Sequence, residues 1–253
     1  MEFIRISQEN LESEHICCAI SSNRDVQVMS KKAWLRDRLD EGLVFLKGNV
    51  RGKCFIEYIP AEYAWVPVRA DGYMYIDCLW VSGQFKGNGY SGMLLDECIR
   101  DSRAKGRRGL VTLSSPKKLG FLADKKYLEH KGFCTADTVA PYFELMYLPF
   151  DGNTQPPRFC DSVKQVTHDM PSGFAIYYTA QCPFTARYVP LLETVARAHG
   201  VPLSVVRITS REAAQGAPSP FTTFSLFYDG RFLTHEILSE KKFEKIITDI
   251  ACK

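Results

Sequence analysis

The sequence lacks the features that mark secreted, membrane-spanning and zinc-binding proteins. None of its nine cysteines forms a Cys-x-x-Cys pair, the spacing typical of structural zinc sites, so no metal is expected. An odd number of cysteines without framework spacing argues against a disulfide-stapled secreted domain. The first ten residues show no basic segment followed by an apolar run, and no stretch approaches ~18 apolar residues. These absences predict a cytoplasmic protein with reduced thiols and no membrane contact.

An excess of one charge sign is also missing. The 32 Lys and Arg residues nearly balance the 29 Asp and Glu residues, which leaves a net charge of +3. No basic block or stripe occurs, so nucleic acid is not expected as a partner. An apolar content of 45% is ordinary for a packed globular protein, and 253 residues suffice for one large domain or two modest ones. Nothing in the sequence indicates an oligomeric state.

The first 150 residues alternate between strand-like and helix-like segments. Strands are expected at residues 3–6, 43–46, 53–59, 74–81, 110–114 and 142–148. Helices are expected from about Leu11, at 31–39, from Tyr90 to the basic run at 105–109 and at 121–131. This order predicts an α/β (α+β) domain at 1–150, with a mixed sheet flanked by helices.

The remaining residues predict a linker and a second, smaller domain. Residues 151–172 contain Asp-Gly-Asn, a Pro-Pro pair and few periodic apolar positions, which is typical of a linker. From residue 173 the pattern gives a strand, a helix, a strand, a hairpin around Asp229-Gly230 and an amphipathic final helix. We therefore expect a small α/β domain at 173–253.

A glycine-rich turn follows the strand at 74–81 and opens the next helix. This geometry directs successive backbone N–H groups at one point, and the helix dipole adds about half a positive charge there. Gly87 and Gly89 let the chain approach an anion without a Cβ in the way, and Lys86 adds a direct charge. The turn therefore predicts a diphosphate site. The Walker A sequence and the dinucleotide-binding fingerprint are both absent.

The run from Ile76 to Leu95 resembles motif A of the GNAT N-acetyltransferase superfamily. Two alignments are open. Gln84-x-x-Gly87-x-Gly89 is the literal match, while Lys86-x-x-Gly89-x-Ser91 keeps Val81 and the Leu94-Leu95 pair at the usual offsets and is preferred. The resemblance implies acetyl-CoA as co-substrate, with the pantetheine arm added beside a strand that splays from its neighbour. The residues implied in binding it are Leu79, Val81, Lys86, Gly87, Asn88, Gly89, Tyr90 and Ser91.

Two further segments, Phe55 to Pro60 and Phe224 to Ile237, resemble YoaP-type acetyltransferases. That family joins a GNAT domain to a C-terminal thioredoxin-like YoaP domain. The resemblance implies an N-acetyltransferase, a GNAT acyltransferase that transfers an acetyl group from acetyl-CoA to the amine of a small molecule. It leaves the acceptor undefined.

Candidate catalytic groups lie on two neighbouring strands. Asp77 and Glu57 are candidate bases or amine-binding groups, and a buried water chain is an equal alternative. Strand alternation predicts Asp77 on the face of Val81, with Cys78 packed on the opposite face. By family analogy, the backbone N–H of Val81 is the oxyanion donor. Tyr127, one position from the tyrosine that GNAT enzymes often carry, is a candidate acid or else a core aromatic.

Cys182 is a candidate thiol site. The segment Thr179 to Thr185 resembles the loop of thioredoxin-like proteins that carries Cys-x-x-Cys, with Thr185 in place of the second cysteine. A thiol at a helix N-terminus has a lowered pKa and is often reactive. The alternative is a domain that only covers the acceptor cleft. The sequence therefore leaves a second hypothesis, a catalytically weak acyl-CoA-binding and thiol-sensing module.

Overall fold

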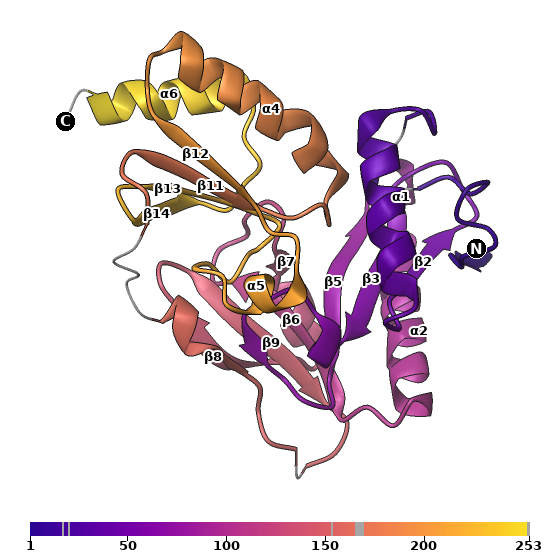
Figure 1. Ribbon diagram of the computed structural model, residues 1–253. Coiled ribbons are helices and arrows are strands. Elements are labelled where there is room, and N and C mark those ends of the chain that lie inside the picture. The colour runs from indigo at the N-terminus through magenta and orange to yellow at the C-terminus, as the bar shows by residue number, and fades with distance from the viewer. Residues whose placement is uncertain (17, 20, 153, 165–169, 252–253) are drawn as a thin grey trace.

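The computed structural model describes residues 1–16, 18–19, 21–152, 154–164 and 170–251 (Figure 1). Within these residues the chain forms an eight-stranded sheet, a four-stranded sheet and a two-stranded ladder. We call residues 1–164, which hold the large sheet, the N-terminal part. Residues 170–251, which hold the four-stranded sheet, are the C-terminal part.

The sheet of the N-terminal part has the strand order β1-β2-β3-β5-β6-β9-β8, with β7 paired to β6. Its strands are β1 (Phe3–Arg5), β2 (Val44–Gly48), β3 (Cys54–Pro60), β5 (Met74–Val81), β6 (Gly109–Ser115), β7 (Ala123–Asp124), β8 (Cys134–Val139) and β9 (Phe143–Pro149). The pairs β5–β6 and β6–β7 are parallel and the others are antiparallel. The predicted mixed sheet is confirmed.

Helices cover both faces of this sheet. On one face lies α1 (Val26–Leu39), whose Trp34 and Leu35 are buried in the larger core cluster. On the other face lie α2 (Tyr90–Ala104) and α3 (Lys125–His130), with Leu94 of α2 and Leu128 of α3 in a second cluster. In α2, the buried residues Leu94, Leu95 and Cys98 recur at helical spacing, which places them on the side facing the strands.

The C-terminal part has the strand order β12-β11-β13-β14, with β11 and β12 parallel and the other pairs antiparallel. Its elements are β11 (Phe174–Tyr178), α4 (Pro183–Ala198), β12 (Leu203–Arg207), α5 (Arg211–Gln215), β13 (Phe224–Tyr228), β14 (Arg231–Thr234) and α6 (Glu240–Ala251). Figure 1 shows α4 and α6 together on one face of this sheet, with α5 on the side of the N-terminal part. The predicted small α/β arrangement is confirmed, and its likeness to thioredoxin remains a prediction.

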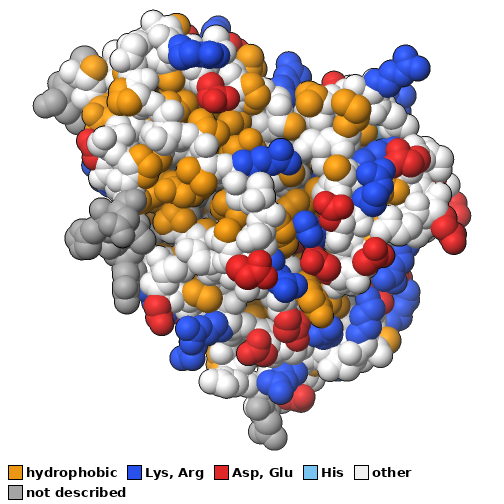
Figure 2. Space-filling view, viewed as in Figure 1, with side chains coloured by type: hydrophobic (Ala, Val, Ile, Leu, Met, Phe, Trp, Pro, Cys, Tyr) orange, Lys and Arg blue, Asp and Glu red, His pale blue; other side chains and the backbone are white. Residues whose placement is uncertain are grey.

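The two parts meet in a shared hydrophobic cluster, beside one further cluster within each part. Ile208, Ala214 and Ala217 of the C-terminal part are buried in the same cluster as Trp34 and Trp65 of the N-terminal part. Hydrogen bonds also join the parts, including Thr222 Oγ1 to the carbonyl of Trp65. The surface seen in Figure 2 agrees, because hydrophobic side chains gather toward the boundary while acidic and basic side chains are mixed elsewhere.

Two expectations about local structure differ from the fold. The helix expected from Leu11 is a series of turns, because Asn10 bonds to the amide of Ser7 and the carbonyl of Arg5, which competes with helix formation. The helix expected from Phe121 starts only at Lys125, after a left-handed Phe121 with a φ of 66°.

The assignment of residues 151–172 as a linker between two domains stays a prediction. This segment carries a short strand, β10 (Arg158–Phe159), that pairs with β4 (Val68–Arg69), and a 3-10 turn at Asp161–Val163. Residues 153 and 165–169 of this segment lie outside the described residues. Among the helices described, none is long and apolar enough to cross a membrane.

Candidate active site

Strand β5 carries a bulge at Asp77. In the pairing with β3, Glu57 lies opposite Cys78 and Tyr58 lies opposite Ile76, so Asp77 has no partner on β3. An extra residue in one strand shifts the alternation of side chains beyond it. Cys78 therefore packs against the larger core cluster, on the face toward α1 and the C-terminal part.

The bulge corrects two expectations based on strict alternation. Cys78 was expected opposite Asp77, but both side chains line the same cavity. Asp77 was expected to share a face with Val81, yet Val81 packs against the second cluster, on the side of α2. Both predictions were wrong because the extra residue, Asp77, lies between Ile76 and Cys78. It reverses which face of the sheet each later side chain of β5 occupies.

Beyond this bulge, β5 separates from β6. Their parallel pairing covers only Met74–Leu110 and Tyr75–Val111, and Thr112 Oγ1 then donates to the Ile76 carbonyl at 3.0 Å. The gap between the two strands leaves backbone groups on one side of β5 without a strand partner. On the other side, the amide of Ser82 donates to the Lys53 carbonyl at 2.9 Å. Because successive amides of a strand alternate in direction, the N–H of Val81 faces the gap.

The glycine-rich turn leads directly into α2. Gly87 and Gly89 adopt φ values of 79° and 76°, which only glycine adopts without strain, and a Cβ added at either would meet nothing within 4 Å. The first hydrogen bond of the helix runs from the amide of Met93 to the carbonyl of Gly89. The amides that precede Met93 in the first turn of α2 therefore have no partner within the helix, and no acidic side chain lies there.

Asn88 stabilises the turn through hydrogen bonds from its exposed side chain. Its Nδ2 donates to the carbonyls of Gln84 and Lys86, both at 3.1 Å. The side chain thereby links the two ends of the short loop between β5 and α2. Asn88 does not line the cavity described next, and its contact with a ligand stays a prediction.

One cavity of about 710 Å³ connects the turn with the buried carboxylates. It is lined by nearly all the residues that the sequence indicated, namely Glu57, Asp77, Leu79, Val81, Lys86, Gly87, Gly89, Tyr90, Ser91, Tyr127 and Cys182. The C-terminal part adds Gln181, Phe184, Phe221 and Thr223 to the wall. Residues from both parts of the chain therefore enclose a single space that starts at the turn and ends at Asp77.

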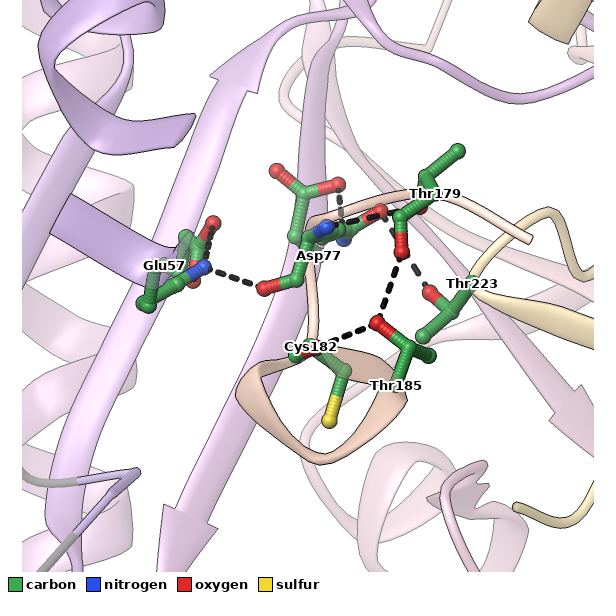
Figure 3. Close-up of polar contacts among 8 residues, drawn as sticks. Glu57, Asp77, Thr179, Cys182, Thr185 and Thr223 are labelled. Atoms are coloured by element: carbon green, nitrogen blue, oxygen red, sulfur yellow. Dashed lines mark hydrogen bonds and ion pairs between the residues drawn. The ribbon is translucent and has the colours of Figure 1, made fainter. Parts of the chain in front are cut away.

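A buried ion pair lies at the inner end of the cavity. Lys31 Nζ, from α1, lies 2.7 Å from Glu57 Oε1 and 2.6 Å from Glu57 Oε2, and it also donates to the carbonyl of Gln181 at 2.7 Å. The side chains of Lys31 and Glu57 are 1% and 2% exposed. The arrangement of these polar groups is drawn in Figure 3. Glu57 is thus committed to an ion pair, and Asp124, which also lines the cavity, pairs with Lys118, whereas Asp77 accepts its hydrogen bond from the uncharged Gln181.

Asp77 has an unusual environment for a carboxyl group. Burial and the nearby negative charge of Glu57 hold the pKa of Asp77 well above its ordinary value, while Lys31 and a hydrogen bond from Gln181 oppose that shift. Gln181 Nε2 donates to Asp77 Oδ1 at 2.9 Å. Burial alone would lower the pKa of Lys31, but the charge of Glu57 raises it, so Lys31 stays protonated. A carboxyl with a raised pKa is a stronger proton acceptor, once ionised, than an ordinary carboxylate.

Tyr127 lies in the cavity wall near the turn. Burial raises the pKa of its hydroxyl, and Ser91 is the polar side chain beside it. Within the described residues, no hydrogen bond of good geometry reaches the hydroxyl. A buried hydroxyl without a firm partner is free to donate its proton to a group that enters the cavity.

Cys182 differs from its prediction. It is the N-cap residue of α4, where a helix dipole would lower the pKa of a thiol, yet burial raises the pKa of Cys182 to about 11. Desolvation of the thiolate outweighs the dipole here. Figure 3 shows the sulfur directed away from Asp77.

Two polar residues of the site were not predicted from the sequence. Lys31 lies in the same stripe of α1 as buried Val28 and Leu35, and a lysine within such an apolar stripe is a signal that could have identified it. Gln181 gives no comparable signal, because its role depends on contacts with residues about 100 to 150 positions away. Among the described residues, no group of His, Cys, Asp or Glu side chains is arranged to hold a metal ion.

The chain resembles several acetyltransferases. A family model described as YoaP-like matches residues 202–245. A relative from Bacillus subtilis (strain 168), named as an uncharacterized N-acetyltransferase YoaP, is 46% identical over 252 residues, which cover 99% of this chain and 100% of the relative.

Solved structures also match parts of the chain. An aminoglycoside 6'-acetyltransferase type Ii is 12% identical, with 61% of this chain and 100% of that chain covered and a TM-score of 0.43. The PaiA N-acetyltransferase of Thermoplasma acidophilum, solved with coenzyme A, is 17% identical, with 59% and 100% covered and a TM-score of 0.38. Since the B. subtilis relative matches along practically the whole chain, the protein belongs to the YoaP family of GNAT N-acetyltransferases.

Proposed function

We propose that the protein transfers the acetyl group of acetyl-CoA to the amine of a small molecule bound beside Asp77. The observation that carries the proposal is the single cavity that joins an anion-binding turn to a buried carboxyl group of raised pKa. The bound thioester supplies an acetyl group, so that a nitrogen–carbon bond forms as the carbon–sulfur bond breaks. The residues of this chain hold the two substrates and move the protons.

The turn fits a diphosphate. Its glycines leave open space where a side chain would block an anion, and the first amides of α2 point out of the helix without partners inside it. Lys86 adds a positive charge at the mouth of the cavity. The gap between β5 and β6 fits an extended pantetheine arm, which pairs with free backbone groups as an added strand does.

Proton movements are assigned to the groups nearest each end of the transfer. The carboxylate of Asp77 accepts a proton from the attacking amine. The N–H of Val81, which faces the gap, donates to the carbonyl oxygen as negative charge develops on it. The hydroxyl of Tyr127 donates a proton to the departing thiolate. Glu57 stays paired with Lys31, which neutralises its charge, so Asp77 is the group that accepts the proton.

The enclosure of the cavity supports a small acceptor. Gln181, Phe184 and Thr223 from the C-terminal part form part of its wall. A volume of about 710 Å³ lies within the range of roughly 300–1,000 Å³ usual for small-molecule sites. A lysine on a folded protein would have to reach Asp77 past the C-terminal part, whereas a free amine enters whole.

A screen with labelled acetyl-CoA tests the proposal. The full-length protein is incubated with carbon-13-labelled acetyl-CoA and a panel of aliphatic, aromatic and polycationic amines, and products are detected by mass spectrometry. We expect at least one acetylated amine, with one free CoA released per acetyl group, and acetyl-CoA binding by calorimetry. Absence of both binding and amine-dependent CoA release would overturn the proposal.

The alternative of a thiol-sensing module has less support. A sensor thiol needs a thiolate, and the raised pKa of Cys182 works against one. Cys182 and its neighbours instead form a fixed part of the cavity wall.

A further inference from the structure

Gln181 reaches from the C-terminal part into the site of the N-terminal part. It lies in the loop between β11 and α4, next to Cys182, and is 8% exposed. Its carboxamide nitrogen donates to Asp77 Oδ1 at 2.9 Å, and its backbone carbonyl accepts from Lys31 Nζ at 2.7 Å. One residue therefore connects the carboxyl that faces the cavity with the cation that neutralises Glu57.

Other contacts fix the orientation of the carboxamide. Thr223 Oγ1, at the entrance to β13, donates to Gln181 Oε1 at 3.4 Å. With its oxygen held by this hydroxyl, the amide presents its N–H group to Asp77. Thr185 Oγ1 holds the rest of the loop, because it lies within hydrogen-bond distance of the carbonyls of Thr179, at 2.9 Å, and Cys182, at 2.8 Å. The loop is thus braced on both sides of Gln181.

We propose that Gln181 is a positioning residue of the acetyl-transfer site, and that the C-terminal part supplies it so that the carboxylate of Asp77 is held toward the acceptor amine. The inference rests on the proposed function of Asp77. It assigns the C-terminal part a direct role in the reaction, through a carboxamide rather than through the neighbouring thiol.

The chemistry of the pair explains why a carboxamide suits this position. A neutral N–H donor stabilises the ionised form of Asp77, which is the form that accepts a proton. The other groups around Asp77 are Glu57 of β3, Lys31 of α1, Tyr75 and the thiol of Cys78 on β5, while the Cys182 thiol lines the same cavity but points away. Since the Lys31 ammonium is already bound by both oxygens of Glu57 and by the Gln181 carbonyl, the Gln181 amide is the hydrogen-bond donor seen on Asp77.

The test compares Gln181→Met with Gln215→Met. Methionine keeps the length of the side chain and removes the donor. Gln215 is a matched control, because its Nε2 also crosses to the N-terminal part, to the carbonyls of Glu62 and Ala64, but it does not line the cavity. Two readouts are taken on full-length protein: the titration of the Asp77 carboxyl by carbon-13 NMR with acetyl-CoA present, and the pH profile of kcat/KM for an accepted amine.

We expect Gln181→Met to raise the apparent pKa of Asp77 by roughly one to two units, as loss of a hydrogen bond to a charged group predicts. The acid limb of kcat/KM should shift upward by the same amount, with the dissociation constant of acetyl-CoA unchanged within about twofold. Gln215→Met should change neither. If Asp77 titrates alike in Gln181→Met and wild type, and the acid limb stays in place, the inference is overturned while the proposed function stands. If the wild-type protein acetylates no amine, the proposed function fails, and with it the role assigned to Gln181.

Discussion

Lys31 and Glu57 form an ion pair with a nitrogen–oxygen distance of 2.6 Å, although both side chains are almost wholly buried. Both charges are largely shielded from bulk solvent, so each depends on the other. Lys31 comes from α1 and Glu57 from β3, and the carbonyl of Gln181 completes the coordination of the ammonium. The pair thus ties a helix, a strand and the C-terminal part together at the inner end of the cavity.

The first prediction concerns the loss of this cation. Lys31→Met should lower the free energy of unfolding by about 3–5 kcal/mol, because it leaves the charge of Glu57 buried and uncompensated. Urea denaturation followed by circular dichroism measures the change. Lys31→Met combined with Glu57→Gln should recover most of the loss.

An exposed pair gives the control for this prediction. Arg100 and Glu97 on α2 form an ion pair with the arginine 74% exposed. Arg100→Met should cost less than ~1 kcal/mol. Equal losses for Lys31→Met and Arg100→Met would contradict the assignment of a buried, mutually dependent pair.

The second prediction concerns the turn. Gly89→Ala should weaken acetyl-CoA binding by at least ~10-fold, because a Cβ at this left-handed position enters the open space before the first amides of α2 and strains the backbone. Calorimetry with acetyl-CoA measures the change. Gly106 is the matched control, since it has a φ of 65°, equally open surroundings, and lies beyond the far end of α2.

Both glycine substitutions should reduce stability to a similar extent, by roughly 1–2 kcal/mol. Only Gly89→Ala should weaken the binding of acetyl-CoA. A parallel loss of acetyl-CoA affinity in Gly106→Ala would attribute the effect to stability and not to the turn.

The third prediction concerns the base. Asp77→Asn should lower kcat by about 10²–10⁴-fold and leave acetyl-CoA affinity unchanged, because the amide keeps the shape of the carboxyl and cannot accept the proton. In wild type, activity should fall as the pH falls through the pKa of Asp77. That limb should lie above the ordinary carboxyl range, since burial and Glu57 raise the pKa. Initial rates from pH 5 to 9 test both points, and an Asp77→Asn enzyme of normal kcat would exclude the role.

The fourth prediction follows from the same pKa by linkage. A carboxyl group whose pKa is higher in the folded than in the unfolded state destabilises the fold as the pH rises through the folded value. Asp77→Asn should therefore exceed wild type in free energy of unfolding at alkaline pH, and this advantage should shrink toward pH 4. Urea titrations at several pH values measure the difference. An advantage that does not depend on pH would mean that the pKa of Asp77 is not raised by folding.

The fifth prediction separates catalysis from thiol chemistry. Cys182→Ser should leave acetyl transfer within about threefold of wild type, because the sulfur is turned away from Asp77. At neutral pH, Cys182 should react with iodoacetamide ~100-fold more slowly than an ordinary thiol, because a pKa of about 11 leaves little thiolate. Mass spectrometry of labelled peptides compares it with exposed Cys134. Rapid labelling of Cys182 would favour the sensing alternative.

Much of the fold and the turn could be predicted because their signals are local. The turn combines glycines, a preceding apolar strand and an amphipathic helix within about twenty residues, so Gly87, Gly89 and the start of α2 followed from the sequence. The strand carrying Asp77 was equally clear. The orientation of individual side chains, by contrast, depends on how each strand pairs with its neighbours in the sheet.

The bulge at Asp77 illustrates this limit. Its position is set by the register between β3 and β5, and nothing in the residues from Ile76 to Leu79 indicates which one is left unpaired. The orientations of the Cys78 and Val81 side chains therefore could not be predicted from the sequence. The role of Gln181 could not be predicted for a related reason, since its hydrogen-bond partners Lys31 and Asp77 belong to distant segments of the sequence.

The apolar cluster that contains both Trp34 and Ile208 has a consequence for how the enzyme turns over. Swinging the two lobes apart would expose these side chains to water, which is costly for every cycle. The two parts should therefore stay packed against each other while substrates bind and products leave.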